Sequence, residues 1–264
     1  MKCREIYEAL DRQIPFSYQM DWDNSGFLIG RGDKEIRNIL TALDLTDAVL
    51  DSALEMNADL IVTHHPMIWD PIKSVTDKDP VGRRVLRLAE NGICYIASHT
   101  CYDAAPGGMA DICADMIGLK GTPLIPVGEK DGKAFGIGKT GTLERPMELD
   151  EIVKLVKEAF ALDTVTVYGS EIWDGPTDRA AMCPGSGRGE YPSAAASGAR
   201  VFITGDYTHH EGLDAVMAGL TVIDAGHFGL EKVFIRDMSR RLAAICGEET
   251  GIGITYETYG GRLM

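Results

Sequence analysis

Short apolar runs alternate with stretches of helical periodicity along nearly the whole chain. A short apolar run bounded by turn residues is typical of a buried strand, and apolar residues spaced three and four apart are typical of a helix with one buried face. The runs predict strands at residues 39–45, 60–63, 93–97, 165–168, 201–204 and 221–223. The helical stretches predict helices at residues 47–57, 81–91, 108–117, 149–160, 211–218 and 230–245. This alternation indicates an α/β protein with a mostly parallel sheet.

Two parts of the chain resemble one another. Residues 57–63 are similar to residues 198–204, and residues 91–96 are similar to residues 218–223. In each case a helix is expected to end at a small residue, a buried strand follows, and polar residues of metal-ligand type come after the strand. Because the two similarities occur in the same order, we interpret them as a duplicated α/β unit.

One segment is a candidate linker. Residues 121–133 (GTPLIPVGEKDGK) are rich in proline, glycine and lysine, a composition typical of a connection between domains. We therefore predict two halves, residues 1–124 and 125–264, and expect the C-terminal segment to complete the first half.

The composition excludes several function classes. The 264 residues include 26 Lys and Arg against 40 Asp and Glu, so the net charge is −14, which disfavours general binding to nucleic acid. No apolar stretch reaches the roughly 20 residues of a membrane helix, and the charged start shows no signal-peptide core. We expect a cytoplasmic protein whose six cysteines are reduced thiols, since none of them forms a CxxC pair.

The six histidines fall into three clusters: His64 with His65, His99, and His209 with His210 and His227. His64 and His65 come directly after a predicted buried strand, at the edge where α/β sheets bind ligands. Neighbouring side chains on extended backbone point apart, so this pair suits two metal ions better than one. The alternative is a pair of surface histidines in a loop.

Two further segments carry ligand-type residues after a strand. Asp103 is either a metal carboxylate or a cap for the helix expected from residue 108. His227 and Glu231 are four residues apart, so on a helix they share one face and can converge on one ion or bridge two. The pattern therefore gives five candidate ligands: His64, His65, Asp103, His227 and Glu231. Imidazoles with a bridging carboxylate suit zinc, iron, manganese, cobalt or nickel, and do not suit calcium.

Other residues have several interpretations. His99 is a metal ligand, a residue that orients a ligand, or a proton shuttle. His209 and His210 are ligands, acid/base groups or helix-start residues, and we expect them near the site without contacting the ions. Cys101 is more consistent with a structural thiol than with a metal ligand. The glycine-rich loop at 185–189 lacks the Lys-Ser/Thr of a P-loop, and a tight turn before a helix at Pro192 fits it better than a phosphate site.

Five motifs together resemble those of the Nif-three-like family, whose members are often labelled GTP cyclohydrolase I type 2 homologues. They are WDNSGFLIG (22–30), IVTHHP (61–66), HTCYDAAPGG (99–108), ITGDYTHH (203–210) and DAGHFGLE (224–231). The resemblance implies two similar intertwined α/β domains, a dinuclear metal centre in a cleft and a toroidal homohexamer. By motif position it also implies the same five metal ligands, with Glu231 as the bridging carboxylate.

Two classes of function fit two divalent ions per chain. The first is a metal-dependent hydrolase acting on a nucleotide, phosphoester or amide, in which His99, His209 or His210 relays protons. The second is a metal-handling or regulatory protein without hydrolytic chemistry. No cysteine pair resembles the zinc site of the established GTP cyclohydrolases, and nothing in the residues specifies GTP.

Overall fold

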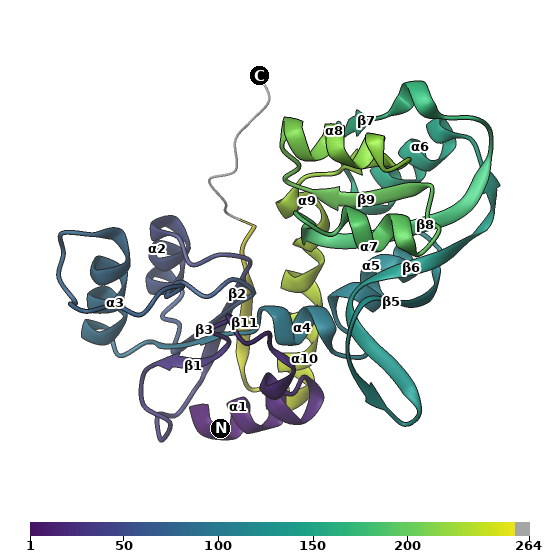
Figure 1. The fold of residues 1–264 in the computed structure, drawn as a ribbon. Coiled ribbons are helices and arrows are strands. Elements are labelled where there is room, and N and C mark those ends of the chain that lie inside the picture. Colours follow the sequence, from purple (N-terminus) through teal and green to yellow (C-terminus); the bar gives the residue numbers. More distant parts are fainter. Residues whose placement is uncertain (257–264) are drawn as a thin grey trace. The chain divides into compact units, whose positions relative to one another are not determined.

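Two β-sheets, each with helices on both faces, organise the chain (Figure 1). The computed structural model describes residues 1–256. It contains two compact units. Unit 1 comprises Met1–Tyr102 and the described chain from Phe234 on, and unit 2 comprises Asp103–Val233. Unit 1 is therefore built from two separate segments of the chain, and unit 2 is inserted between them in sequence.

Unit 1 contains a five-stranded sheet in the order β1-β4-β3-β2-β11. Its strands are β1 (Gly26–Ile29), β2 (Asn38–Ala42), β3 (Leu60–Thr63), β4 (Cys94–Ala97) and β11 (Gly251–Ile254). All neighbours are parallel except β1, which pairs with β4 in antiparallel fashion. The helices are α1 (Cys3–Gln13), α2 (Asp47–Glu55), α3 (Pro80–Glu90) and α10 (Val233–Cys246), with a short 3-10 turn, η1 (Phe16–Tyr18), after α1. The chain leaves unit 1 through α4 (Thr100–Ala104).

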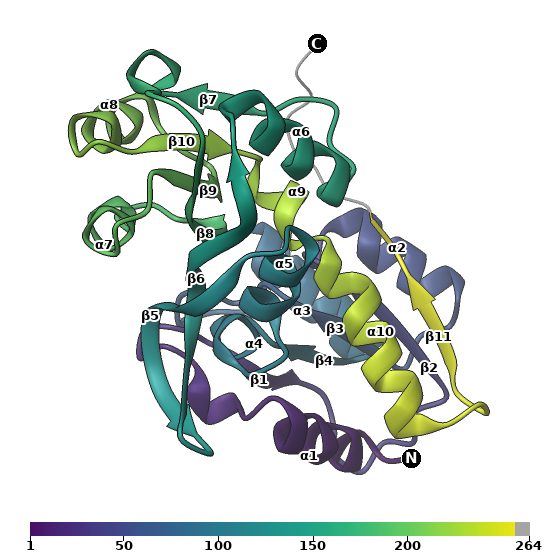
Figure 2. The ribbon, with the colours of Figure 1, turned by 90° about the vertical axis from the view of Figure 1, so that its right-hand side faces the viewer.

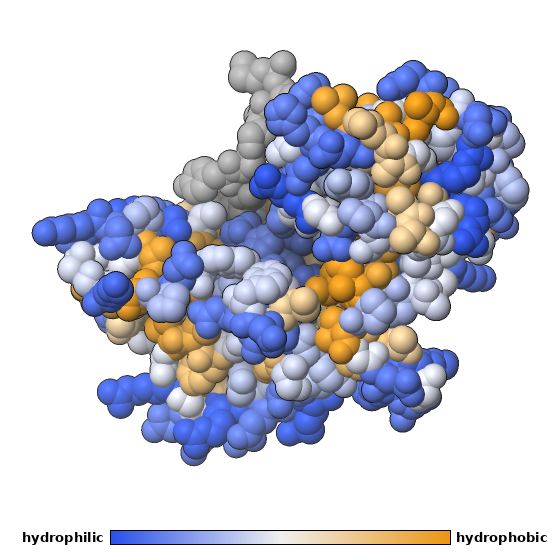
Figure 3. Space-filling model, in the orientation of Figure 1, coloured by the Kyte–Doolittle hydropathy of each residue, from blue (hydrophilic) through white to orange (hydrophobic). Residues whose placement is uncertain are grey.

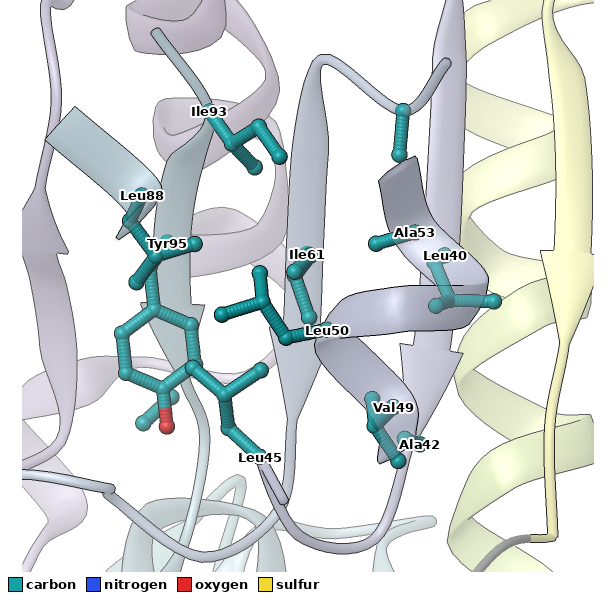
Figure 4. Packing of buried hydrophobic residues seen from close by; sticks show 12 residues of the cluster. Leu40, Ala42, Leu45, Val49, Leu50, Ala53, Ile61, Leu88, Ile93 and Tyr95 are labelled. Carbon is teal, nitrogen blue, oxygen red and sulfur yellow. The ribbon is translucent and has the colours of Figure 1, made fainter. Parts of the chain in front are cut away.

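Alternating side chains divide the core of unit 1 between the two faces of its sheet. On one face, Leu40 and Ile61 pack against Val49 and Leu50 of α2, together with Tyr95 (Figure 4). On the opposite face, the hydroxyl of Thr41 donates to the carbonyl oxygen of Ile235 in α10 at 3.3 Å. Figure 2 shows α10 running beside β2 and β11. The sheet is thus the middle of three layers.

Unit 2 contains a six-stranded sheet in the order β5-β6-β8-β9-β10-β7. Its strands are β5 (Lys120–Lys130), β6 (Lys133–Met147), β7 (Thr166–Tyr168), β8 (Thr177–Ser186), β9 (Val201–Gly205) and β10 (Thr221–Asp224). The helices are α5 (Met109–Met116), α6 (Leu149–Phe160), α7 (Tyr191–Ala196), α8 (His209–Met217) and α9 (His227–Glu231), with η2 (Ser170–Ile172). One core cluster joins Ala194 of α7 and Ala215 of α8 to Phe202 and Val222 of the sheet.

The two units repeat one topology, which confirms the predicted duplication. The series α1-β1-β2-α2-β3-α3-β4-α4 corresponds in order to α6-β7-β8-α7-β9-α8-β10-α9. In both sheets three consecutive strands are parallel, and the strand that precedes them lies antiparallel beside the last of the three. Residues that follow β3 and β4 in unit 1 therefore correspond to residues that follow β9 and β10 in unit 2.

The linker expected at residues 121–133 is wrong, because these residues form most of β5 and the turn into β6. The two strands pair in antiparallel register from Lys120 with Thr142 to Lys130 with Lys133. Asp131 and Gly132 have φ of 52° and 74°, as in the tight two-residue turn that an Asp-Gly pair favours. The Asp-Gly pair is the sequence signal for this hairpin.

Two other expectations need correction. The sheet of unit 2 is mixed, since β5–β6, β6–β8 and β7–β10 are antiparallel pairs. The strands β5 and β6 form a hairpin, which needs no helical crossover, so helical periodicity between apolar runs does not reveal this pair. The helix expected at residues 230–245 is two helices, α9 and α10, which are separated at Lys232.

Hydrophilic residues cover most of the face shown in Figure 3, and hydrophobic residues form separate patches on it. Among residues 1–256, no helix combines the length and apolar character needed to cross a bilayer.

Candidate metal-ligating residues

The turn after β3 holds His64 and His65. All four residues of β3 are buried, and the backbone N–H groups of both histidines donate to the carbonyl oxygen of Leu43, at 3.2 and 3.0 Å. The hydroxyl of Tyr95 donates to the carbonyl oxygen of His65 at 3.0 Å and accepts from the N–H of Met67 at 2.9 Å. The turn is thus held from both neighbouring strands, which limits the movement of the two imidazoles.

Each imidazole of this pair is oriented through Nδ1. The Nδ1 of His64 lies 2.9 Å from the carbonyl oxygen of Ser98, and the Nδ1 of His65 lies 2.8 Å from Oδ1 of Asp44. A carbonyl oxygen and a carboxylate only accept hydrogen bonds, so Nδ1 carries the proton in both rings. In a neutral imidazole the lone pair is then on Nε2, a nitrogen that can ligate a metal. Asp44 is a functional candidate that our sequence reasoning missed.

His99 is oriented in the same way by Asp23, whose Oδ1 lies 2.9 Å from Nδ1. The side chain of Asp23 is fully buried and also accepts hydrogen bonds from Ser25 and Thr100. Burial raises the pKa of Asp23, but the hydrogen bond and charge of His99 and the bonds from Thr100 and Ser25 outweigh it and lower the pKa below its usual range. Asp23 belongs to the 22–30 motif, but our sequence reasoning gave it no role.

Unit 1 brings three of the sequence-predicted histidines together. The ring centroids are 4.8 Å apart for His64 and His65, 5.1 Å for His64 and His99, and 5.4 Å for His65 and His99. One ring nitrogen from each histidine lies within 4.8 Å of the others, a spacing that allows a shared ion. His64 is fully buried, whereas the other two side chains are partly exposed, at 19% and 12%.

Unit 2 holds the remaining three of the five candidate ligands, Asp103, His227 and Glu231. His227 and Glu231 lie one turn apart on α9, with His227 Nε2 2.9 Å from Glu231 Oε2. The Nδ1 of His227 lies 2.9 Å from Oδ2 of Asp206, a third orienting carboxylate that was not predicted. A carboxylate oxygen of Asp103 lies within 4.8 Å of one of Glu231. The alternative role of Asp103 as a helix cap is wrong, because the N-cap residue of α5 is Gly108 and no side chain caps this helix.

The glycine-rich loop at 185–189 contacts the carboxylate of α9. A Cβ on Gly185 would lie 2.0 Å from Oε1 of Glu231 and 3.4 Å from Nε2 of His227. Gly185 and Ser186 end β8, and the residues after them turn into α7, which agrees with the tight-turn interpretation. The N–H of Gly187 is engaged by Thr204 and donates to its Oγ1 at 2.9 Å.

His209, His210 and Cys101 lie apart from the groups that orient the other imidazoles. His209 and His210 are exposed and begin α8, which Thr208 and Glu211 cap reciprocally; their rings contact each other at 5.4 Å. The fully buried thiol of Cys101 lies 3.4 Å from Oγ of Ser98, as a structural cysteine would.

Unit 2 also has a cavity of about 700 Å³. The residues that line it include Pro123, Phe135 and Lys139, and none of the five candidate ligands is among them.

The family model Duf34/NIF3 (NGG1p interacting factor 3) matches residues 1–258 of this chain. The chain belongs to the Duf34/NIF3 family. A relative from Clostridium acetobutylicum, named GTP cyclohydrolase 1 type 2 homolog, is 31% identical over 92% of this chain and 90% of its own length. One from Streptococcus pneumoniae with the same name is 31% identical over 92% and 91%.

A solved structure of a Bacillus cereus protein related to NIF3 has the same fold. Its TM-score is 0.87, with 21% identity, and the match covers 100% of this chain and 99% of that chain. The predicted family is thus confirmed by sequence, and the predicted α/β fold by structure.

Proposed function

We propose that this NIF3-family protein is a metal-dependent hydrolase of a small molecule. Two divalent ions per chain would be held by five side chains: His64, His65, Asp103, His227 and Glu231. The observation that carries the proposal is the orientation of the three imidazoles in this set, whose Nδ1 atoms all face groups that only accept hydrogen bonds. Metal-ligating histidines are typically fixed in this way by a carboxylate or carbonyl.

The donor set fits borderline divalent ions. Imidazole nitrogens and carboxylate oxygens suit zinc, iron, manganese, cobalt or nickel. Glu231 is 3% exposed, and a buried carboxylate needs a positive charge or strong donors close to it. A carboxylate oxygen of Asp103 within 4.8 Å of it adds a second negative charge, which favours a cation at this point.

When bound, such ions supply Lewis acidity that polarises a carbonyl or phosphoryl oxygen and makes water a better nucleophile. His99 is our proposed proton-transfer group. Asp23 holds the proton on its Nδ1, so Nε2 can accept a proton from water or give one to a leaving group. His209 and His210 stay predictions for acid/base work, because both are exposed and their rings contact each other.

Metal content tests the ligand assignment. We expect Glu231→Gln and His65→Asn each to lose at least one ion per chain by elemental analysis of protein purified with divalent metals. Glu158→Gln is the matched control, since it makes the same change at an exposed position of α6 and should leave the content unchanged. Full metal content in both ligand variants would refute the assignment.

A screen of metal-loaded protein against nucleotides, phosphoesters and peptides tests hydrolysis, with Glu231→Gln as the inactive control. Bound ions without turnover in any class would instead indicate the metal-handling or regulatory role. The homohexamer implied by the family resemblance belongs to the same proposal, and the cytoplasmic location stays a prediction from the sequence.

A further inference from the structure

Two large aromatic side chains of unit 1 are exposed beside the imidazoles. Trp22 is 58% exposed and Trp69 is 51% exposed. Their ring centroids lie 5.7 Å apart, and they lie 6.0 Å and 5.4 Å from the ring of His99. We call Trp22 and Trp69 the indole pair. Leaving two indoles in water forgoes the free energy of burying them, so a pair placed here indicates a binding role.

The indole pair is held in place by the elements that orient the histidines. Trp22 precedes Asp23, the residue that fixes His99, and Trp69 follows the turn that carries His64 and His65. The side-chain amide of Asn24 donates to the carbonyl oxygen of Ile68 at 2.7 Å, which ties the two loops together. A preorganised aromatic surface loses little entropy when a ligand binds.

The geometry identifies the kind of ligand. The planes are tilted by 40° and their centroids are at contact distance for an aromatic pair, so no ring can insert between them. The exposed parts of the two rings instead offer an aromatic surface on which a flat ring can stack. Asp21 and Asp70, both exposed, are the sequence neighbours of the two tryptophans, and the chain carries a charge of −14. Both features favour a neutral or cationic ring over a polyanion.

We propose that the indole pair binds a planar heteroaromatic ring of the substrate and thereby places its substituents beside the imidazoles. This assignment deepens the proposed function and rests on it for the chemistry that follows binding. Among the substrate classes considered, it selects the heterocyclic ring found in nucleotides over phosphoesters and amides that lack a flat ring, and the acidic surroundings favour a ring that carries no phosphate chain.

Guanosine and ribose are the probes, with affinities measured by calorimetry on metal-loaded and metal-free protein. We expect guanosine to bind and ribose not to bind. Trp22→Ala and Trp69→Ala should each weaken guanosine binding roughly tenfold, as expected for the loss of one stacking face. Trp22→Phe and Trp69→Phe should retain most of the affinity, because they keep an aromatic face.

Trp173→Phe is the matched control, since this third tryptophan lies in unit 2 and is engaged by Arg200 and Glu148. It should leave the affinity unchanged. Equal affinity for guanosine and ribose, or guanosine binding undiminished in both alanine variants, would overturn the inference.

Metal content of the same proteins separates this inference from the proposed function. Guanosine binding that depends on the indole pair, in a protein without bound ions, would sustain the inference while the proposed function fails. Bound ions in a protein that does not prefer guanosine to ribose would sustain the proposed function while the inference fails.

Discussion

Gly185 cannot be replaced without moving a candidate ligand. Its φ is 75°, which favours glycine, and a Cβ there would meet Oε1 of Glu231 at 2.0 Å. The close approach of Glu231 to the backbone of Gly185 gives this position a reason to be glycine that does not involve phosphate binding. The residue acts on the carboxylate through packing alone.

We predict that Gly185→Ala lowers metal content by at least one ion per chain, because the added methyl group displaces the carboxylate of Glu231. Gly189→Ala is the control. Gly189 has a similar φ of 81°, but nothing lies within 4 Å of its Cβ position. Both variants therefore carry backbone strain of about 1–2 kcal/mol, and only the first carries the clash. Elemental analysis that finds equal metal content in the two variants would contradict the role of Gly185.

Asp23 gives a pH-dependent prediction. The pKa of Asp23 is lowered on folding, so its contribution to stability is complete above its unfolded pKa of about 4 and is lost as the pH falls through the folded value. Asp23→Asn should cost on the order of 2 kcal/mol at neutral pH, because buried donors lose their charged acceptor. The free energy of unfolding of this variant should also fall less steeply between neutral pH and acid than that of the wild type.

Denaturant unfolding at several pH values measures both effects. Asp206→Asn serves for comparison, since Asp206 also faces a histidine Nδ1 but its side chain is 56% exposed, and exposed pairs contribute little. Parallel pH profiles for wild type and Asp23→Asn would show that this carboxylate is not the source of the acid sensitivity.

Strands β3 and β4 cooperate to place the histidine turn. Tyr95 of β4 is fully buried, and its hydroxyl lies 2.7 Å from Oγ1 of Thr63 at the end of β3, besides its bonds to the turn that follows. One hydroxyl thus connects a strand end, a histidine carbonyl and the next loop. The parallel register of Leu60 with Cys94 and of Thr63 with Ala97 brings these groups together.

We predict that Tyr95→Phe costs about 1–3 kcal/mol of stability, since it leaves buried polar groups unsatisfied, and also weakens metal binding through the loosened turn. Tyr102→Phe is the matched control: Tyr102 is equally buried, and its hydroxyl bonds Asp237 of α10. The control should lose stability with little change in metal affinity. Titration of both variants with zinc, alongside denaturant unfolding, separates the two effects.

The duplication determines how the chain as a whole distributes its candidate ligands. His64 and His65 follow β3, and Asp103 lies on α4 just after β4. In the second copy, Asp206 follows β9, and His227 and Glu231 lie on α9 after β10. Each copy therefore carries imidazole and carboxylate side chains after its third and fourth strands, and the repeated topology accounts for their similar placement.

The family resemblance predicts a homohexamer. Sedimentation equilibrium of the full chain should give a mass about six times the protomer's 28.7 kDa, because a symmetric homo-oligomer closes at a fixed number of copies. A protomer mass that does not change with concentration would contradict this prediction.

Prediction from the sequence succeeded where one pattern dominated a segment. The strand at 60–63 and the helix at 149–160 have the predicted bounds, because an unbroken apolar run and a strong amphipathic period leave few alternatives. It failed at β5 and β6, which are long, partly exposed strands without a continuous apolar run. The prolines and glycines of β5 also made residues 121–133 look like a linker.

The sequence by itself determined the family, the α/β class, the duplication and the residue types at the strand ends, since these depend on local pattern and motif order. Tertiary structure alone decided which groups orient the imidazoles. Asp23 is 76 residues from His99 and Asp44 is 21 residues from His65, and Gly185 meets Glu231 from a different element. Such pairs form only when strands assemble into a sheet, and no periodicity along the chain encodes them.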